Sequence, residues 1–234
     1  MTERLWLQDA RRKTALASVT GHHAGGFTLD KSLYHASDPR YHHRQPCDRG
    51  HALVDGSKLK VHKVALDRGV LVHRTESALP PVGARAQLHL DADRRGQQAR
   101  AHALMHVLLA ALAEQRADHL APPEVVGNGE VKLHVRARDL ARAEARARQL
   151  LATRAPVEVV WMARDDAARR ATPQHVPLDA VAPDEPTLRM VRMGDWSLLP
   201  CDAPLVEHVW QVGEVRFAPP QPVRDGARWR ARVV

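Results

Sequence analysis

Two histidines, His102 and His106, lie four residues apart in the apolar run Ala101-His-Ala-Leu-Met-His-Val-Leu-Leu109. Four residues is a little over one turn of an α-helix, so both imidazoles leave the same face and can converge on one metal ion. Cys201 and His208 offer a thiolate and another imidazole, and together these ligand types suit zinc best among the common cations. The sequence therefore predicts a zinc site if the two segments meet, and it leaves open whether they do.

The histidine pair taken alone is a weak signal. Helical histidines more often form the polar edge of a core than bind a metal. Ala103 also stands where the metalloprotease pattern His-Glu-x-x-His has its general-base glutamate. The pair therefore does not predict peptide cleavage.

The chain is basic, with 35 Lys and Arg against 27 Asp and Glu and a formal net charge of +8. This excess favours a polyanionic partner, with nucleic acid as the first candidate. An arginine-rich proteome without any anionic partner is the alternative, and charge alone does not separate the two. One candidate binding face is a row of arginines on a predicted helix, and its members are Arg138, Arg142, Arg146 and Arg148.

The two cysteines, Cys47 and Cys201, form no spaced set, which argues against a disulfide scaffold and fits a reducing compartment. The first residues carry charges without an uninterrupted apolar stretch, so they resemble neither a signal peptide nor a membrane anchor. We expect a cytoplasmic protein without a membrane partner.

Short runs of strand-forming residues between Gly, Asp and Pro dominate the chain up to about Leu90. These runs are 4–7, 14–19, 26–29, 59–64 and 69–73. The polar stretch 34–51 has no regular period, which is typical of a functional or mobile loop. We predict a small β-barrel domain over residues 1–85, with a sandwich as the other architecture that the pattern allows.

Helical and strand patterns are mixed in the rest of the chain. Strands are predicted at 86–90, 129–135, 157–161, 188–193 and 208–217, and helices around the histidine pair and over 137–152. The sequence therefore predicts an α+β fold, in which residues 86–217 form a domain of antiparallel sheet and helices. Residues 218–234 are predicted to be a C-terminal tail.

The order of the motifs resembles one family closely. A Leu-Gln-Asp-Ala opening, a Gln45-Pro-Cys-Asp-Arg-Gly50 loop, the His-x3-His helix, and a late Cys and His before a Gly-Glu pair follow one another. The run from Arg100 to Leu109 is similar to the family's Arg-x-His-Thr-Ala-x-His-Leu-Leu, and the run from Val212 to Val215 is similar to its Thr-Gly-Glu-Ile. From about Leu5 to Phe217, the chain resembles the freestanding alanyl-tRNA editing proteins, which are related to the editing domains of alanyl- and threonyl-tRNA synthetases.

The resemblance implies a function and a set of site residues. It implies hydrolysis of mischarged aminoacyl-tRNA, with seryl- or glycyl-tRNA for alanine as the expected substrates, tRNA as the partner and zinc as the cofactor. It implies His102, His106, Cys201 and His208 as zinc ligands and Gln45 as a pocket residue near the substrate. No catalytic residue is assigned.

Both loops that would line the pocket depart from the family pattern. The family's Gly-Gly-Gln-Pro is replaced by His43-Arg-Gln-Pro46, which removes the small-residue approach to the substrate. The family's Cys-Gly-Gly-Thr-His is replaced by Cys201-Asp-Ala-Pro-Leu-Val-Glu-His208, which has three more residues and lacks the Thr. The longer loop makes His208 the ligand that we expect to be loose. Asp202 and Glu207 are then candidate replacements or general bases, or else solvent-facing carboxylates.

Two other functions stay open. The chain can be a non-catalytic, zinc-stabilised tRNA- or RNA-binding module with a degenerate editing pocket, since structural zinc sites contribute directly to folding. It can also be a hydrolase for a different small ester or amide. The sequence leaves open which amino acid and which tRNA are recognised, and also the oligomeric state.

Overall fold

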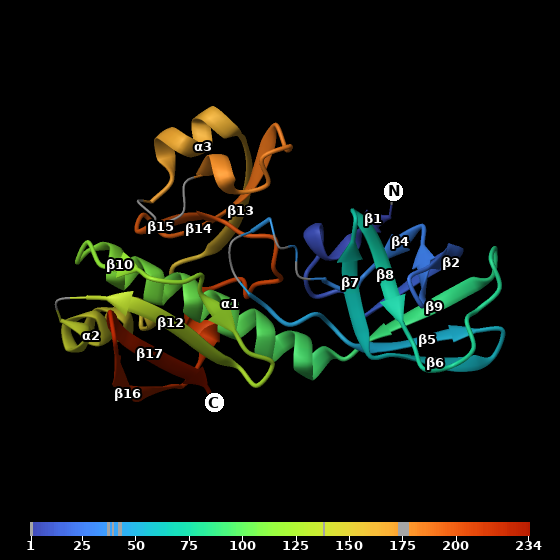
Figure 1. Cartoon of the computed structure of the whole chain (residues 1–234), viewed down its shortest axis with the longest axis horizontal. Coiled ribbons are helices and arrows are strands. Elements are labelled where there is room, and N and C mark those ends of the chain that lie inside the picture. The colour runs from blue at the N-terminus through green and yellow to red at the C-terminus, as the bar shows by residue number, and fades with distance from the viewer. Residues whose placement is uncertain (1, 37, 39, 42–43, 138, 173–177) are drawn as a thin grey trace. The chain divides into compact units, whose positions relative to one another are not determined.

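The computed structural model describes every residue except 1, 37, 39, 42–43, 138 and 173–177 (Figure 1). The chain divides into two compact units. The first unit consists of residues 1–38 and 46–96, and the second consists of residues 39–45 and 97–234. Helix α1 (Ala92–Ala113) begins in the first unit and continues into the second.

The first unit is built on a seven-stranded sheet with the order β6-β5-β9-β2-β3-β8-β7, in which all neighbours are antiparallel. Its strands are β2 (Thr14–His23), β3 (Gly26–Leu29), β5 (Gly50–Val54), β6 (Ser57–Val61), β7 (Lys63–Asp67), β8 (Val70–Arg74) and β9 (Arg85–Leu90). A short parallel pair, β1 (Glu3–Arg4) and β4 (Lys31–Ser32), and the 3-10 turn η1 (Leu5–Leu7) complete the unit.

Two tight hairpins explain the local order of this sheet. Asp55 and Gly56 connect β5 to β6 with φ angles of 48° and 78°, and Arg68 and Gly69 connect β7 to β8 with φ angles of 49° and 82°. Two consecutive residues with positive φ are the mark of a type I′ turn, whose twist matches that of the flanking strands. Glycine at the second position adopts this backbone without a Cβ clash.

The predicted N-terminal β-barrel and the predicted α+β class are both wrong. Strands hold 42% of the described residues and helices 23%, so the fold is mostly β-sheet. In the described part of the first unit, β6 and β7 are the two terminal strands and do not pair with each other, which leaves the sheet open. His62 alone separates β6 from β7. One residue is too short for a hairpin turn, so these two strands cannot close a barrel by folding back on each other.

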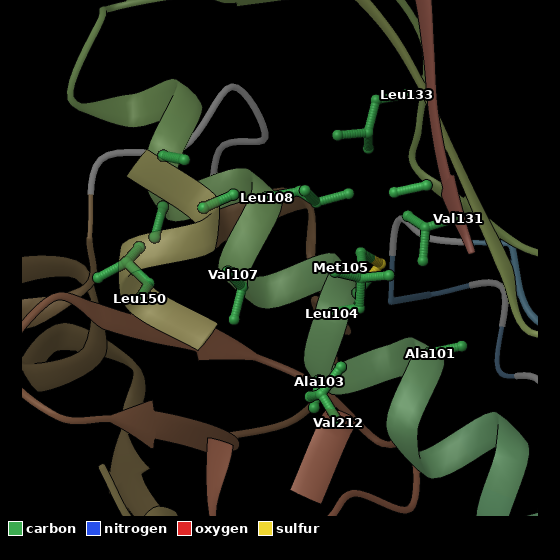
Figure 2. Close-up of a cluster of buried hydrophobic side chains, with 14 of the residues drawn as sticks. Ala101, Ala103, Leu104, Met105, Val107, Leu108, Val131, Leu133, Leu150 and Val212 are labelled. Carbon is green, nitrogen blue, oxygen red and sulfur yellow. The ribbon is translucent and has the colours of Figure 1, made fainter. Parts of the chain in front are cut away.

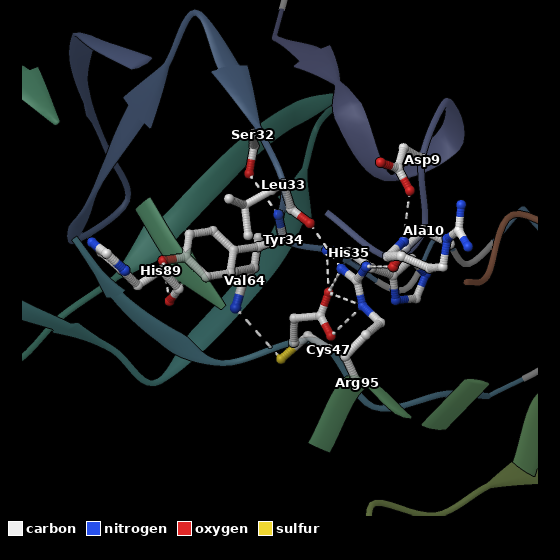
Figure 3. A network of polar contacts seen from close by, with 12 residues as sticks. Asp9, Ala10, Ser32, Leu33, Tyr34, His35, Cys47, Val64, His89 and Arg95 are labelled. Carbon is white, nitrogen blue, oxygen red and sulfur yellow. Dashed lines mark hydrogen bonds and ion pairs between the residues drawn. The ribbon is translucent and has the colours of Figure 1, made fainter. Parts of the chain in front are cut away.

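A buried ion pair holds the long loop of the first unit to the start of α1. The Arg95 guanidinium donates hydrogen bonds to both carboxylate oxygens of Asp48, and both side chains are almost fully buried. Arg95 also donates to the carbonyl oxygens of Ala10 at 2.7 Å and Leu33 at 2.8 Å (Figure 3). Because a buried charge is costly without partners, these four acceptor atoms fix the loop and the helix start together.

The second unit contains two antiparallel sheets. The larger has the order β10-β12-β17-β16, with β11 also paired to β12, and the smaller has the order β13-β14-β15. Their strands are β10 (Asp118–His119), β11 (Glu124–Val125), β12 (Glu130–Arg136), β13 (Val157–Ala163), β14 (Thr187–Met193), β15 (Ser197–Pro200), β16 (Val215–Val223) and β17 (Gly226–Val233). The other elements are α2 (Leu140–Leu151), α3 (Arg164–Arg170), η2 (Leu178–Ala180) and η3 (Val209–Val212).

The residues predicted to form a C-terminal tail, 218–234, are instead part of the larger sheet. They contain the end of β16 and all of β17, and β17 pairs with both β12 and β16. The ring of Trp229 is buried and stacks on that of Phe217, with 5.9 Å between the ring centroids. The apolar side of β17 needs this burial, so the segment folds back as a central strand.

The core of the second unit forms around α1. Between residues 101 and 112 this helix is buried on nearly every side, and its apolar residues join those of β12, β17 and α2 in one cluster. Figure 2 shows Met105 and Leu108 of α1 in this cluster, with Val131 and Leu133 of β12 and Leu150 of α2. A helix that is apolar all round is typical of the centre of a domain. No helix among the described residues has the length and hydropathy needed to cross a lipid bilayer.

Candidate metal and substrate site

The histidine pair lies at the centre of this core. His102 and His106 are both on α1, as predicted, and their exposed fractions are 0% and 1%. Helix α1 is buried on nearly all of its sides around the pair. The two imidazoles are therefore isolated from bulk water. In such a buried position, a polar group without a hydrogen-bond partner is most costly.

The orientation of His102 is set by the helix itself. Its Nδ1 lies 2.9 Å from the carbonyl oxygen of Gln98 one turn earlier. A carbonyl oxygen only accepts, so Nδ1 carries the hydrogen and Nε2 of the neutral ring carries the lone pair. Metal-binding histidines are commonly oriented in this way, by donating the other ring hydrogen to a carbonyl group.

His106 presents the clearest polar mismatch in the core. Neither Nδ1 nor Nε2 of His106 has a hydrogen-bond partner among the described residues, and both atoms are buried. The neutral ring keeps one N–H and one lone pair, and a buried unsatisfied polar group costs about 1–3 kcal/mol. A metal ion bound at the lone pair would remove part of this cost, so the residue fits a ligand role better than a packing role.

Cys201 lies in the same core. It follows β15, is fully buried and belongs to the apolar cluster that contains Leu104 and Met105 of α1. Its backbone N–H donates to the carbonyl oxygen of Arg189 on β14 at 3.1 Å. The thiol thus lies in the same apolar cluster as residues of α1, and a metal site shared with the histidine pair stays a prediction.

His208 lies elsewhere. Its side chain is exposed, and its backbone N–H donates to Oε1 of Gln211 at 2.9 Å at the start of η3. Within the described ranges, no group of three or more His, Cys, Asp or Glu side chains is arranged to hold a metal. The four-ligand set therefore stays a prediction. The donors that fit zinc in chemistry and burial are the two helical histidines and Cys201.

Gln45 is tied to the segment that follows Cys201. Its Nε2 donates to Oδ1 of Asp202 at 2.8 Å, and Asp202 is 3% exposed. The residue predicted to line the pocket is thus joined to the cysteine loop, although 157 positions separate the two in sequence. Glu207, the other carboxylate considered in this loop, is exposed.

Sequence reasoning missed Arg189. This β14 residue is 2% exposed, and its Nη1 donates to the carbonyl oxygens of Cys201 and Ala203. Its Nε–H has no hydrogen-bond partner among the described residues. The guanidinium therefore holds the backbone on both sides of Asp202. Arg189 lies in the run Leu-Arg-Met-Val-Arg-Met, and the order of polar and apolar residues in this run does not indicate that an arginine is buried.

Comparison with known proteins shows what the whole chain is similar to. No model of a known protein family matches the chain. The chain is similar over 96% of its length to alanine-tRNA ligases from Korarchaeum cryptofilum (26% identical over 232 residues), Methanothermobacter thermautotrophicus (25% over 234 residues) and Methanopyrus kandleri (25% over 236 residues). The chain spans 25% of the length of each of these three ligases.

The chain is similar to one part of the alanine-tRNA ligases. This finding confirms the predicted relationship to alanyl-tRNA synthetases. That the chain acts as a freestanding protein stays a prediction.

Proposed function

We propose that the chain is an aminoacyl-tRNA editing hydrolase, which cleaves the ester bond of a mischarged tRNA, with seryl- or glycyl-tRNA for alanine as substrate. The observation that carries the proposal is the buried His102–His106 pair on α1, in a chain that is similar over nearly its whole length to a quarter of the alanine-tRNA ligases. The donor chemistry of the core supports zinc as the cofactor.

His102, His106 and Cys201 would hold the zinc ion. When bound with three protein ligands, zinc keeps a position at which it can polarise a water molecule or an ester carbonyl group. His102 would offer Nε2, because its Nδ1–H is directed to the carbonyl oxygen of Gln98. Burial of the pair keeps bulk water away, which strengthens every electrostatic interaction at the site.

Gln45 would position the substrate. An aminoacyl ester is already activated, so the site mainly has to orient the reacting groups and stabilise the developing oxyanion. The hydrogen bond to Asp202 fixes the amide of Gln45, and Arg189 fixes the backbone around Asp202. Asp202 would act as a positioning residue, because its Oδ1 accepts the hydrogen bond from Gln45.

A panel of mischarged tRNAs tests the proposal. Seryl-, glycyl- and alanyl-tRNA for alanine and seryl-tRNA for threonine are incubated with the full chain, with and without prior removal of metal by a chelator. We expect hydrolysis of seryl- or glycyl-tRNA for alanine, and its loss after chelation. Equal, background-level release from every tRNA would overturn the proposed activity.

The rebuilt loops and the exposed position of His208 favour a second function. If these loops no longer form a substrate pocket, the chain can be a non-catalytic tRNA-binding module in which zinc held by the buried donors stabilises the fold. In that case chelation would unfold the protein, and the panel would show tRNA binding without deacylation.

A further inference from the structure

One face of the larger sheet of the second unit carries a row of arginines. Strand β17 alternates three arginines with the buried residues Trp229, Ala231 and Val233, which pack into the core with α1. Because successive side chains of a strand point to opposite faces, the arginines share the face away from the core. They are Arg228, Arg230 and Arg232.

The neighbouring strands add cations at directly opposite positions. Arg216 of β16 is paired with Arg232, and Lys132 of β12 is paired with Arg230. The Cβ atoms of directly opposite residues lie about 4.5–5.5 Å apart, and like charges there destabilise a sheet. These two like-charge pairs do not stabilise the sheet, although Arg232 also faces Glu130 of β12 and its Nε donates to the carbonyl oxygen of Asn128 at 3.1 Å. We call the following six residues the basic face: Lys132, Arg136, Arg216, Arg228, Arg230 and Arg232.

Acidic neighbours neutralise the basic face only in part. Four carboxylates approach it, with N–O distances of 3.6–3.8 Å, and the pairs are Glu124–Lys132, Asp118–Arg136, Glu214–Arg216 and Glu130–Arg230. Three of these pairs have at least one exposed side chain, and exposed pairs contribute about 0–1 kcal/mol, so these carboxylates can be exchanged for another anion at little cost. Arg228 and Arg232 have no carboxylate within 4.0 Å in the part of the chain that the structure describes.

Helix α2, which the sequence suggested as the binding face, is less suited. Arg146 is paired with Glu114 at 2.9 Å, and Arg148 is paired with Glu144 at 2.8 Å and lies over the ring of Phe217. Arg142 is exposed, and Arg138 lies outside the described residues. The arginines of α2 are thus largely engaged within the protein, whereas the basic face has cations in excess.

We propose that the basic face binds the phosphodiester backbone of RNA. Arginines two positions apart on β17 are about 6.8 Å apart along the strand, which gives a row of separate charges that suits a repeating polyanion better than a single phosphate. None of the exposed large apolar residues lies on β12, β16 or β17. A membrane-binding surface would need such residues, so the face fits RNA better than lipid. The identity of this RNA rests on the proposed function: it would be the tRNA whose aminoacyl end enters the editing site.

The test compares two double variants with equal loss of charge. Arg228→Gln with Arg232→Gln removes the two cations of the basic face that have no carboxylate partner. Arg154→Gln with Arg170→Gln is the matched control, because both arginines are exposed in the same unit outside the larger sheet. Binding of uncharged tRNA transcript to the full chain is measured by fluorescence anisotropy over a salt series, and thermal unfolding verifies that all proteins are folded.

We expect the Arg228/Arg232 variant to bind tRNA on the order of tenfold more weakly at low salt, with a salt dependence shallower by about one to two charges. The control should bind within about twofold of wild type. Equal weakening in both variants, or no weakening in either, would overturn the inference. So would binding of wild type to phosphatidylglycerol vesicles that is as tight as its binding to tRNA at the same salt and is lost in the Arg228/Arg232 variant.

The same preparations separate this inference from the proposed function. If wild type binds tRNA through the basic face but releases no amino acid from the mischarged panel, the surface stands and the proposed activity fails. If wild type deacylates while both double variants bind equally, the proposed activity stands and the surface is wrong.

Discussion

The side-chain amide of Gln45 donates a 2.8 Å hydrogen bond to the carboxylate of Asp202, the residue that follows the buried Cys201. This bond joins the predicted substrate residue to the predicted metal segment. It indicates that the two loops that depart most from the family pattern still meet in the second unit.

The Gln45–Asp202 bond predicts strong coupling between two single variants. A hydrogen bond to a buried charged group contributes about 1.5–3 kcal/mol, so Gln45→Ala and Asp202→Ala should each lower the free energy of unfolding. The double variant should lose less than the sum, with a coupling energy of about 1–2 kcal/mol in urea unfolding. Additive losses would mean that the two side chains act independently.

Zinc content should depend on the buried histidines and not on His208. Replacing His106 by Ala removes a buried donor, so elemental analysis should show the zinc content falling from about one ion per chain towards zero. His208→Ala should keep its zinc, because the exposed side chain lies apart from the buried donors. The same zinc content in wild type and His106→Ala would rule out the pair as ligands.

The stability of the first unit should fall in mild acid because of His73. This ring is fully buried, its Nε2 lies 2.8 Å from Oγ of Ser32, and its Nδ1–H donates to the carbonyl oxygen of Phe27. Burial lowers the pKa of His73 from 6.5 to about 4. As the pH falls, His73 therefore becomes protonated near pH 6.5 in the unfolded chain but only near pH 4 in the folded chain.

The sign of the effect follows from this proton uptake. His73 contributes stability fully above pH 6.5, and the contribution is lost as the pH falls towards 4, by about 2 kcal/mol at pH 5. Urea unfolding at pH 7.5 and pH 5 measures the loss. His73→Leu should show a correspondingly smaller difference between the two pH values, and the same difference in both proteins would contradict the assignment.

Local patterns in the sequence predicted the helices better than the sheets. The predicted helix 137–152 is confirmed as α2, which begins after Asp139, whose side chain accepts from the backbone N–H of Arg142. Such a cap depends only on neighbours in sequence. The open sheet of the first unit depends on which distant strands pair, so periodicity alone could not distinguish it from a barrel.

The missed strand β17 had a visible signal. Arg228 to Val233 alternates charged and apolar residues with the period of a half-buried strand. The prolines before it suggested the end of the fold, whereas β16 continues through them with a register shift after Ala218. Proline is tolerated at such irregular positions of a strand.

The site was only partly accessible to sequence reasoning. The spacing of His102 and His106 was enough to place both on one helix, because helical geometry is local. The bond between Gln45 and Asp202 and the buried Arg189 depend on the packing of segments far apart in sequence. No spacing rule encodes such contacts.

The most direct test of the central claim is the single-turnover rate of seryl-tRNA hydrolysis, with tRNA for alanine, by wild type and by His106→Ala. We expect wild type to release serine well above the uncatalysed rate, correctly charged alanyl-tRNA to be hydrolysed more slowly, and His106→Ala to be slower than wild type by about a hundredfold. Circular dichroism must show both proteins folded. Equal rates for wild type and folded His106→Ala would contradict the account, because the buried histidine pair would then have no part in the reaction.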